Sequence, residues 1–168
     1  MVHSAFSQNA SLIATSSLDC TIKFWDFATL NHDGLFSDSV CALSVLEFLN
    51  PFPILAAADI QGNILLIATR PHPRQGECLH AFRHVLDDVA KVATTKSTNL
   101  DTFLTRNDSD IVDEEEKAEV SFVSSMKWCM NEETQEGFLF TGDEGGNVHV
   151  WDLTKTLQRL GIEVKRVF

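Results

Sequence analysis

One stretch near the C-terminal end, residues 137–153, restricts the possible folds more than any other. It begins with the apolar run Phe138-Leu139-Phe140 and passes through a turn rich in Gly, Asp and Asn. It ends in residues 148–153, which alternate in polarity and include a Trp-Asp pair. Glycine and asparagine accept the backbone angles of a tight turn, and alternation places one side of a strand in a core. The stretch therefore predicts a β-hairpin.

The pattern of this hairpin occurs twice more in the chain. Residues 11–26 end in the pair Trp25-Asp26, which aligns with Trp151-Asp152, and a weaker copy at residues 53–68 has lost the pair. Equivalent apolar positions lie 42 and then 84 residues apart, at Ile22, Ile64 and Val148. A spacing of this size indicates a repeat architecture, in which each repeat is one structural unit that packs against its neighbours.

The repeat resembles that of the WD40 family, in which each repeat forms a four-stranded blade of a β-propeller. The resemblance implies an all-β fold: a partial WD40 β-propeller of about three four-stranded blades, with a long acidic insertion between blades. It also assigns structural WD-repeat positions to Thr15, Asp19, Trp25, Asp26, Thr141, Trp151 and Asp152. An unrelated all-β sandwich with chance Trp-Asp pairs is the alternative, but the shared phase of three copies argues against it.

In regular WD40 blades a turn Asp, a strand Ser or Thr and the Trp form hydrogen bonds with a His from the preceding loop. The resemblance gives Asp19, Thr15 and Trp25 three of these places in the first copy, so we expect Asp19 in a buried hydrogen-bonded set. Gln61 and Gly145 stand at the place of Asp19 in the other copies. The set is therefore expected to be absent from the second copy and incomplete in the third.

The remaining strands follow from runs of alternating or continuous apolar residues. We expect strands over residues 2–6, 12–15, 21–25, 40–48, 54–58, 63–69, 78–84 and 120–129, in addition to the C-terminal hairpin. Residues 31–39 are expected to form a loop, with at most a ragged outer strand. Residues 154–162 are expected to form a short helix, capped by Thr154 and ended by Gly161, or else an outer strand.

Residues 85–119 interrupt the repeat, because they contain no Gly-bearing hairpin turn and become strongly acidic toward residue 119. We interpret them as a partly disordered insertion between blades. The chain then divides into blades one and two at residues 1–84, the insertion at 85–119 and blade three at 120–168. A short helix within the insertion, at residues 86–93, is compatible with this interpretation, and an eroded fourth blade is the alternative.

The acidic part of the insertion has some features of a calcium-binding loop. Asp108, Asp110 and Glu119 have the spacing of three ligand positions. Val112, however, stands where a further ligand is needed, and Asp113 stands where the loop requires Gly. The pattern therefore favours a solvated acidic loop, or a segment that becomes ordered on a basic partner.

Charge and cysteine content exclude several classes of function. The formal net charge of −11 and the isoelectric point of about 4.8 argue against a nucleic-acid surface and against binding to anionic lipid. The sequence has no run long and apolar enough for a membrane span, and no leader is visible. The four cysteines form no Cys-x-x-Cys pair, so we expect neither a zinc site nor any other cofactor.

The resemblance implies a propeller that acts as a rigid, non-catalytic platform, and the sequence contains no catalytic motif. We expect a cytoplasmic scaffold that assembles with other proteins, with the missing blades supplied by a longer parent chain or by a partner. The long acidic insertion and the degraded middle copy are similar in style to divergent WD-repeat proteins of the ciliary axoneme, which makes tubulin or axonemal proteins the expected partners. The alternative is a soluble adaptor or substrate receptor that recognises short peptide motifs on the propeller rim.

Overall fold

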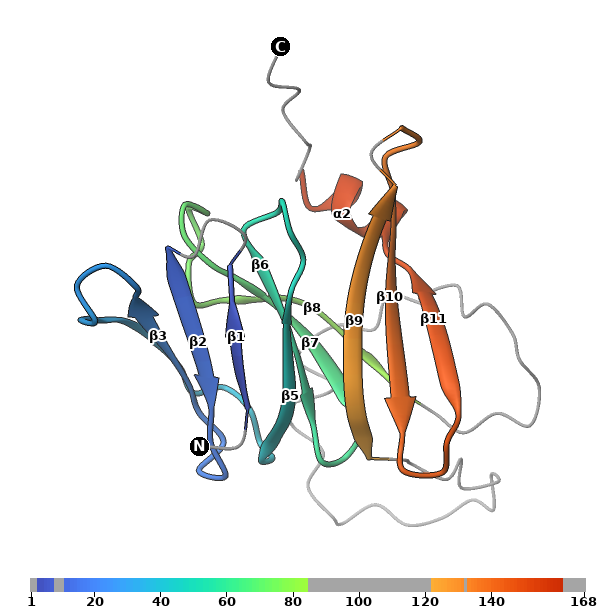
Figure 1. Cartoon of the computed structure of the whole chain (residues 1–168), viewed down its shortest axis with the longest axis horizontal. Coiled ribbons are helices and arrows are strands. Elements are labelled where there is room, and N and C mark those ends of the chain that lie inside the picture. The colour runs from blue at the N-terminus through green and yellow to red at the C-terminus, as the bar shows by residue number, and fades with distance from the viewer. Residues whose placement is uncertain (1–2, 8–10, 85–121, 132, 162–168) are drawn as a thin grey trace, which may run out of the picture.

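The computed structural model describes residues 3–7, 11–84, 122–131 and 133–161, which form three antiparallel sheets standing side by side (Figure 1). The first sheet contains β1 (Ser4–Phe6), β2 (Leu12–Ser16), β3 (Ile22–Asp26) and β4 (His32–Phe36). The second contains β5 (Leu43–Phe48), β6 (Ile54–Asp59), β7 (Asn63–Ala68) and β8 (Cys78–Arg83). The third contains β9 (Val123–Asn131), β10 (Glu136–Asp143) and β11 (Val148–Asp152), and is followed by helix α2 (Thr154–Arg159).

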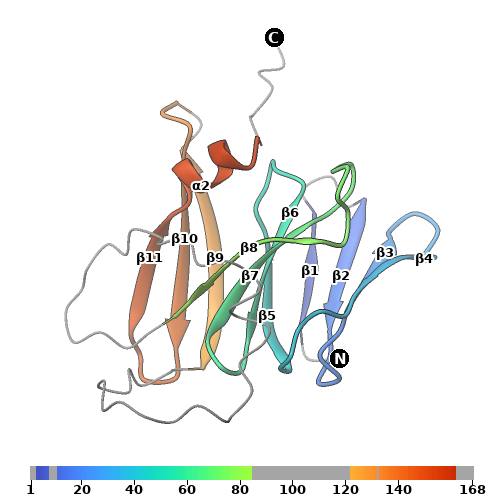
Figure 2. The ribbon, with the colours of Figure 1, turned by 180° about the vertical axis from the view of Figure 1, so that it is seen from behind.

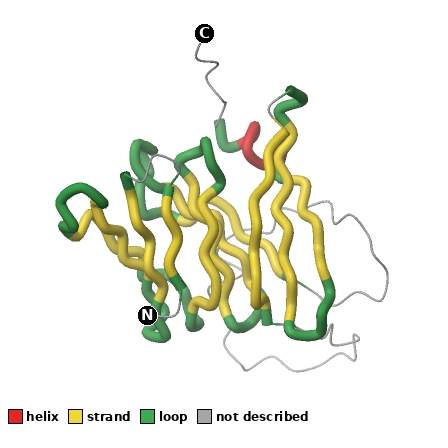
Figure 3. The backbone as a smooth tube through the Cα atoms, viewed as in Figure 1, coloured by secondary structure: helices red, strands yellow, loops and turns green. Residues whose placement is uncertain are grey.

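Within each sheet the strands are hydrogen-bonded in chain order, so every sheet is an antiparallel meander. The first strands of the three sheets, β1, β5 and β9, lie next to one another, as the innermost strands of adjacent propeller blades do. The expected all-β fold of partial propeller blades is therefore confirmed. Figure 3 shows strand along most of the described chain, with α2 at one end of the third sheet.

The second sheet stands between the other two, as Figure 2 shows from behind, and it contributes side chains to a hydrophobic cluster on each of its faces. All residues of β6 and β7 are buried, so these strands read as continuous apolar runs and not as an alternating pattern. Small and large side chains face each other across the pair, since Ala57 pairs with Leu65 and Ala58 with Ile64. This complementary packing explains why the second copy of the repeat looks degenerate in the sequence.

Two elements differ from the sequence predictions. Residues 31–39, expected mainly as a loop, contain strand β4, which pairs with β3 through a register shift between Phe24 and Trp25. The third sheet has three described strands where a four-stranded blade was expected, and α2 follows it, which agrees with the short helix expected at residues 154–162. Strand β4 is difficult to recognise in the sequence because it is polar. It can be polar because it lies at a sheet edge and buries little of its surface.

Helix α2 begins differently from the expected capping by Thr154. Leu153 occupies the N-cap position, and no side chain caps the helix from there. The Thr154 hydroxyl instead accepts a hydrogen bond from the Gly137 N–H at 3.0 Å, which fastens the helix to β10. Gly161 follows the helix with a φ of +69°, a conformation that glycine adopts without strain.

Several sequence predictions fall outside the described residues. They are the acidic insertion at 85–119, the helix at 86–93, the start of the third blade at 120, and the calcium-loop residues Asp108, Asp110 and Glu119. Within the described residues, no helix has the length and apolar character needed to cross a membrane.

Candidate interaction surfaces

The joint between the second and third sheets contains a buried hydrogen-bonded network. The Trp151 indole N–H donates to the Thr141 hydroxyl at 2.9 Å, and this hydroxyl lies 3.0 Å from His84 Nδ1. His84 Nε2 lies 3.4 Å from an oxygen of the Asp143 carboxylate, and both side chains are fully buried. Because His84 directly follows β8 and the other three residues belong to the third sheet, the network connects two sheets.

One arrangement of protons satisfies every member of this network. The indole can only donate, so the Thr141 hydroxyl accepts from Trp151 and donates its own proton to His84 Nδ1. His84 Nε2 then carries the remaining ring proton and donates it to the Asp143 carboxylate. Burial lowers the pKa of His84, and the neighbouring His149, whose ring centroid is 4.1 Å away, lowers it further. The buried imidazole is therefore neutral at pH 7.

The sequence prediction for this joint was wrong. The alignment placed Gly145 opposite Asp19, so the hydrogen-bonded set of the third copy was expected to be incomplete. The structure completes it with Asp143, two residues earlier, and with His84, which sequence reasoning did not connect to the hairpin. The Asp143 carboxylate also accepts from the N–H and the side-chain amide of Asn147.

A spacing in the sequence could have revealed the role of Asp143. In the second sheet, Asp59 accepts hydrogen bonds from the N–H and the side-chain amide of Asn63, the residue four places later. Asp143 and Asn147 have the same spacing and make the same pair of contacts across the equivalent turn. An Asp and an Asn four residues apart therefore mark the turn between the second and third strands in both sheets.

In the first sheet, the Trp25 indole donates to the Thr15 hydroxyl at 3.0 Å, so the structure brings these two residues together. Asp19 does not join them in a buried set, because its side chain is exposed. Its carboxylate accepts from the Thr21 hydroxyl at 2.6 Å and from the Thr21 N–H at 3.1 Å, which closes its own turn. The place equivalent to Asp143 is held by Ser17.

The Asp residues of the two Trp-Asp pairs stabilise the turns that follow them. Asp26 accepts a hydrogen bond from the Thr29 N–H, and Asp152 accepts one from the Thr154 N–H, each at 2.9 Å. Asp152 thereby stabilises the start of α2. Asp26 has a further partner in the second sheet, Arg70.

Arg70 connects the second sheet to the first at the end of β7. Its guanidinium lies 2.7 Å from the Asp26 carboxylate and 2.9 Å from that of Asp33, and it donates to the Ser11 carbonyl at 2.6 Å. The hydrogen bond from Arg70 is the main cause that lowers the pKa of Asp26 to about 2. All three ionic side chains are partly exposed, so solvent and salt screen their attraction.

We expect Arg70→Ala to reduce stability modestly and in a salt-dependent way. The urea midpoint should fall relative to wild type at low salt, and the difference should shrink at roughly 1 M salt, where the screening length is about 3 Å. It should also shrink in acid. The folded pKa of Asp26 is about 2 against an ordinary value of 3.8, so its stabilisation is present above 3.8 and is lost as the pH falls through 2. Arg74→Ala, which removes an arginine without an ion pair among the described residues, is the control. A difference insensitive to both salt and pH would contradict this role.

The two ends of the sheets form two rims, which Figure 1 shows at the bottom and the top. The turn rim carries the β2–β3, β6–β7 and β10–β11 turns. Its exposed aliphatic side chains include those of Leu18, Val40 and Ile60, with exposed fractions of 72%, 58% and 50%. Leu18 and Ile60 occupy the same position in equivalent turns, and the Ile60 N–H donates to the Ala42 carbonyl of the loop that carries Val40. We call these three residues the apolar rim patch.

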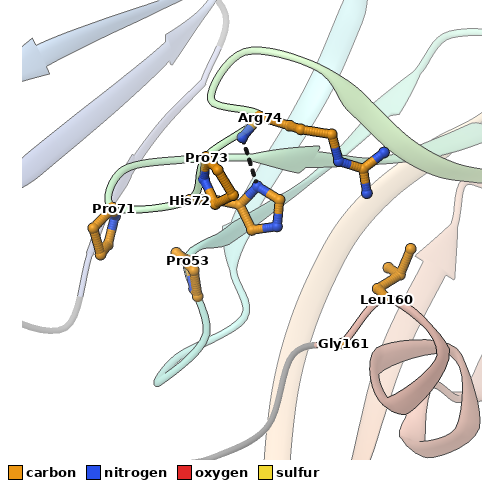
Figure 4. A pocket seen from close by; sticks show the side chains of 7 residues that line it. All are labelled: Pro53, Pro71, His72, Pro73, Arg74, Leu160 and Gly161. Carbon is orange, nitrogen blue, oxygen red and sulfur yellow. Dashed lines mark hydrogen bonds between the residues drawn. The ribbon is translucent and has the colours of Figure 1, made fainter.

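The helix rim carries the β5–β6 and β7–β8 loops and α2, and it contains a hollow of about 400 Å³ (Figure 4). The hollow is lined by Pro53, Pro71, His72, Pro73, Arg74, Leu160 and Gly161. It lies between loops of the second sheet and the end of α2.

No group of three or more His, Cys, Asp or Glu among the described residues could hold a metal ion. Burial raises the pKa of the Cys78 thiol to about 11, so this cysteine remains protonated at neutral pH.

Comparison with known proteins identifies the repeat. Residues 2–26 match the WD40 family model, described as WD domain, G-beta repeat, and no curated protein matches the chain. The crystal structure of Sqt1 from Saccharomyces cerevisiae is similar over 89% of this chain and 30% of that one, with 15% identity and a TM-score of 0.54. The structures described as RRP9 WD40 repeats and as U3-55K each have 15% identity and a TM-score of 0.45, over 50% of this chain and 24% of theirs.

The chain thus spans between 24% and 30% of the length of these three solved structures. For the Sqt1 structure, the identity of 15% and the TM-score of 0.54 show a shared fold and no more. Together with the match over residues 2–26 and the three adjacent antiparallel sheets, it leads to one conclusion. Residues 2–26 of the chain match a WD40 repeat, and the described sheets have the fold of blades of a WD40 propeller.

Proposed function

We propose that this chain is part of a non-catalytic WD40 scaffold on which other proteins assemble. The apolar rim patch is the observation that supports the proposal most directly. Turns at the surface are usually formed by Gly, Pro, Asn, Asp and Ser, yet Leu18, Val40 and Ile60 present aliphatic side chains there. Covering such a side chain completely is favourable by about 1.5–3 kcal/mol, so a partner that covers the patch gains binding energy.

The joints between sheets support the same proposal. A platform must hold its contact residues in fixed positions, because ordering them on binding reduces the affinity. Arg70 fixes the first sheet to the second, and the network around His84 fixes the second to the third. The patch residues Leu18 and Ile60 belong to the first and second sheets, so the joint at Arg70 preserves their relative placement.

The full-length protein can test the scaffold proposal with matched variants. We expect Leu18→Ser combined with Ile60→Ser to reduce the recovery of specific co-purifying proteins by roughly tenfold, as the loss of about 1.4 kcal/mol would do. Leu30→Ser is the control, because Leu30 is 68% exposed but lies in the β3–β4 turn at the other end of the sheet. Quantitative mass spectrometry of the tagged proteins from source cells gives the measurement. Identical recovery from all variants would refute a role for the patch.

A finer version of the proposal places the scaffold on the doublet microtubules of the ciliary axoneme, with tubulin or other axonemal proteins as partners. It is supported by the acidic stretch between the second and third sheets and by the degraded second repeat. The net charge of −11 would repel acidic tubulin. Contact would therefore use basic residues, such as Lys155 and Arg159 of α2, or would be made through a second axonemal protein. Fractionation of cells distinguishes the two locations, since an axonemal component stays with salt-stripped axonemes and a soluble adaptor does not.

A further inference from the structure

We propose that the hollow on the helix rim binds a short acidic peptide segment of a partner protein, with a carboxylate on Arg74 and a neighbouring aliphatic side chain on Leu160. The inference rests on the proposed function in one respect, namely that the partner is a protein. It concerns the rim opposite the apolar rim patch, so the scaffold would hold two partners at two ends. Figure 4 shows the residues that carry the argument.

The walls of the hollow are rigid. Pro53 comes from the β5–β6 loop, and Pro71 and Pro73 come from the β7–β8 loop. The proline ring fixes φ, so these walls lose little conformational freedom when a ligand binds. Pro71 directly follows Arg70, whose bonds to Asp26 and Asp33 anchor the start of the same loop. The hollow is therefore largely formed before any partner arrives.

The polar groups at the hollow donate hydrogen bonds. The Arg74 side chain is exposed and forms no ion pair among the described residues, in contrast to Arg70 four places earlier. His72 Nδ1 accepts a hydrogen bond from the Arg74 N–H at 3.0 Å, so the neutral ring carries its proton on Nε2. Burial lowers the pKa of His72, and the charge of Arg74 lowers it further, which keeps the ring neutral at pH 7. Guanidinium and imidazole N–H groups together select an acceptor, and a carboxylate pairs with the guanidinium.

The charges around the hollow favour the same occupant. Lys155 and Arg159 are exposed on α2, whose C-terminal end lines the hollow, and the charge of Glu77 acts on His72 in the opposite direction to that of Arg74. The Arg74 guanidinium in the lining, which has no ion pair among the described residues, would attract an acidic segment to the hollow on a chain whose net charge is −11. Leu160 and the prolines add apolar surface that a bare anion cannot use, so the combination fits a carboxylate next to an aliphatic side chain.

A labelled model peptide tests the inference on the full-length protein. The probe is a fluorescein-labelled hexapeptide of alternating Glu and Leu with blocked ends, and fluorescence anisotropy measures its binding. We expect Arg74→Gln to weaken binding roughly fivefold, as the loss of a charge-assisted pair at a partly exposed site would do. Lys23→Gln is the control, because it removes an exposed positive charge from β3 in the first sheet. Circular dichroism verifies that each variant is folded.

Companion peptides distinguish the outcomes. A hexapeptide of alternating Gln and Leu should bind at least about fivefold more weakly if the carboxylate is recognised, and one of alternating Glu and Gly should bind more weakly if the aliphatic contact contributes. Equal binding of all three peptides, or equal effects of Arg74→Gln and Lys23→Gln, would overturn the inference. So would displacement of the probe by millimolar inorganic phosphate as readily as by unlabelled peptide, because that result would indicate a bare anion site. Leu18→Ser should leave probe binding unchanged, so failure here is distinguishable from failure of the apolar rim patch.

Discussion

Replacing Gly137 with alanine is expected to destabilise the protein by about 3 kcal/mol or more. A methyl group at this position would lie 2.8 Å from Cζ2 of the Trp128 ring and closer still to Cη2. The ring has little freedom to move, because its indole N–H donates to the Asn50 carbonyl at 2.7 Å and its edge packs against Phe52. Both partners belong to the second sheet, so displacing Trp128 would also open the joint between the sheets.

Urea unfolding followed by tryptophan fluorescence measures this effect. Gly34→Ala is the control, since its added methyl group would meet atoms no closer than 3.5 Å and lies in an edge strand. Combining Gly137→Ala with Trp128→Phe should cost less than the sum of the two single changes, because the smaller ring leaves space for the methyl group. Additive losses, or equal losses for Gly137→Ala and Gly34→Ala, would show that the contact does not limit this position.

The second large effect is expected from His84→Ala, which should cost about 3 kcal/mol. The variant removes a fully buried ring and leaves the buried Thr141 hydroxyl without the acceptor of its proton, which alone costs about 1–3 kcal/mol. It also removes one donor to the Asp143 carboxylate, which keeps its hydrogen bonds from Asn147. Asp19→Ala should cost much less, because Asp19 is exposed and closes only its own turn. Urea midpoints of the two variants provide the comparison. Equal midpoints would mean that the network at the joint contributes nothing.

The network also predicts a dependence of stability on pH. Because burial lowers the pKa of His84 below its ordinary value of 6.5, its contribution to stability is fully present above 6.5. That contribution is lost as the pH falls through the lowered value, since protonation would leave the Thr141 hydroxyl without the ring acceptor. Asp143 and His149 are the titratable groups facing His84, and their charges act in opposite directions. The difference in unfolding free energy between wild type and His84→Ala should therefore shrink between pH 7.5 and mildly acidic pH. A constant difference would exclude a neutral His84 in the folded state.

The sequence predicted what depends on local pattern. Both hairpins that end in Trp-Asp were predicted, because turn residues and alternating polarity lie within one short segment of the chain. The pairs Thr15–Trp25 and Thr141–Trp151 are likewise local, since antiparallel pairing of adjacent strands places their side chains on one face.

The missed features depend on contacts between distant segments or on weak local signals. His84 is separated from Thr141 by the whole acidic insertion, so no regular spacing in the sequence predicts their contact. The alignment then favoured Asp19 over Asp143 as the network carboxylate, although the two occupy turn positions two residues apart relative to their tryptophans. Strand β4 was expected only as a ragged outer strand within a loop, because an edge strand needs few apolar residues. The apolar rim patch and the hollow were not predicted, because both combine residues from several loops.

The middle sheet has a further consequence for how sequences with this fold can change over time. All residues of β6 and β7 are buried, and most of their apolar side chains belong to one of two hydrophobic clusters. Ala57 and Ala58 of β6 pair with the larger Leu65 and Ile64 of β7. Ala57 is buried, so a larger side chain at this position cannot extend into solvent. It would be accepted only if Leu65 became smaller at the same time. Drift in this sheet should therefore occur as coupled exchanges of constant combined volume. Positions of the exposed β4 edge should instead vary one at a time.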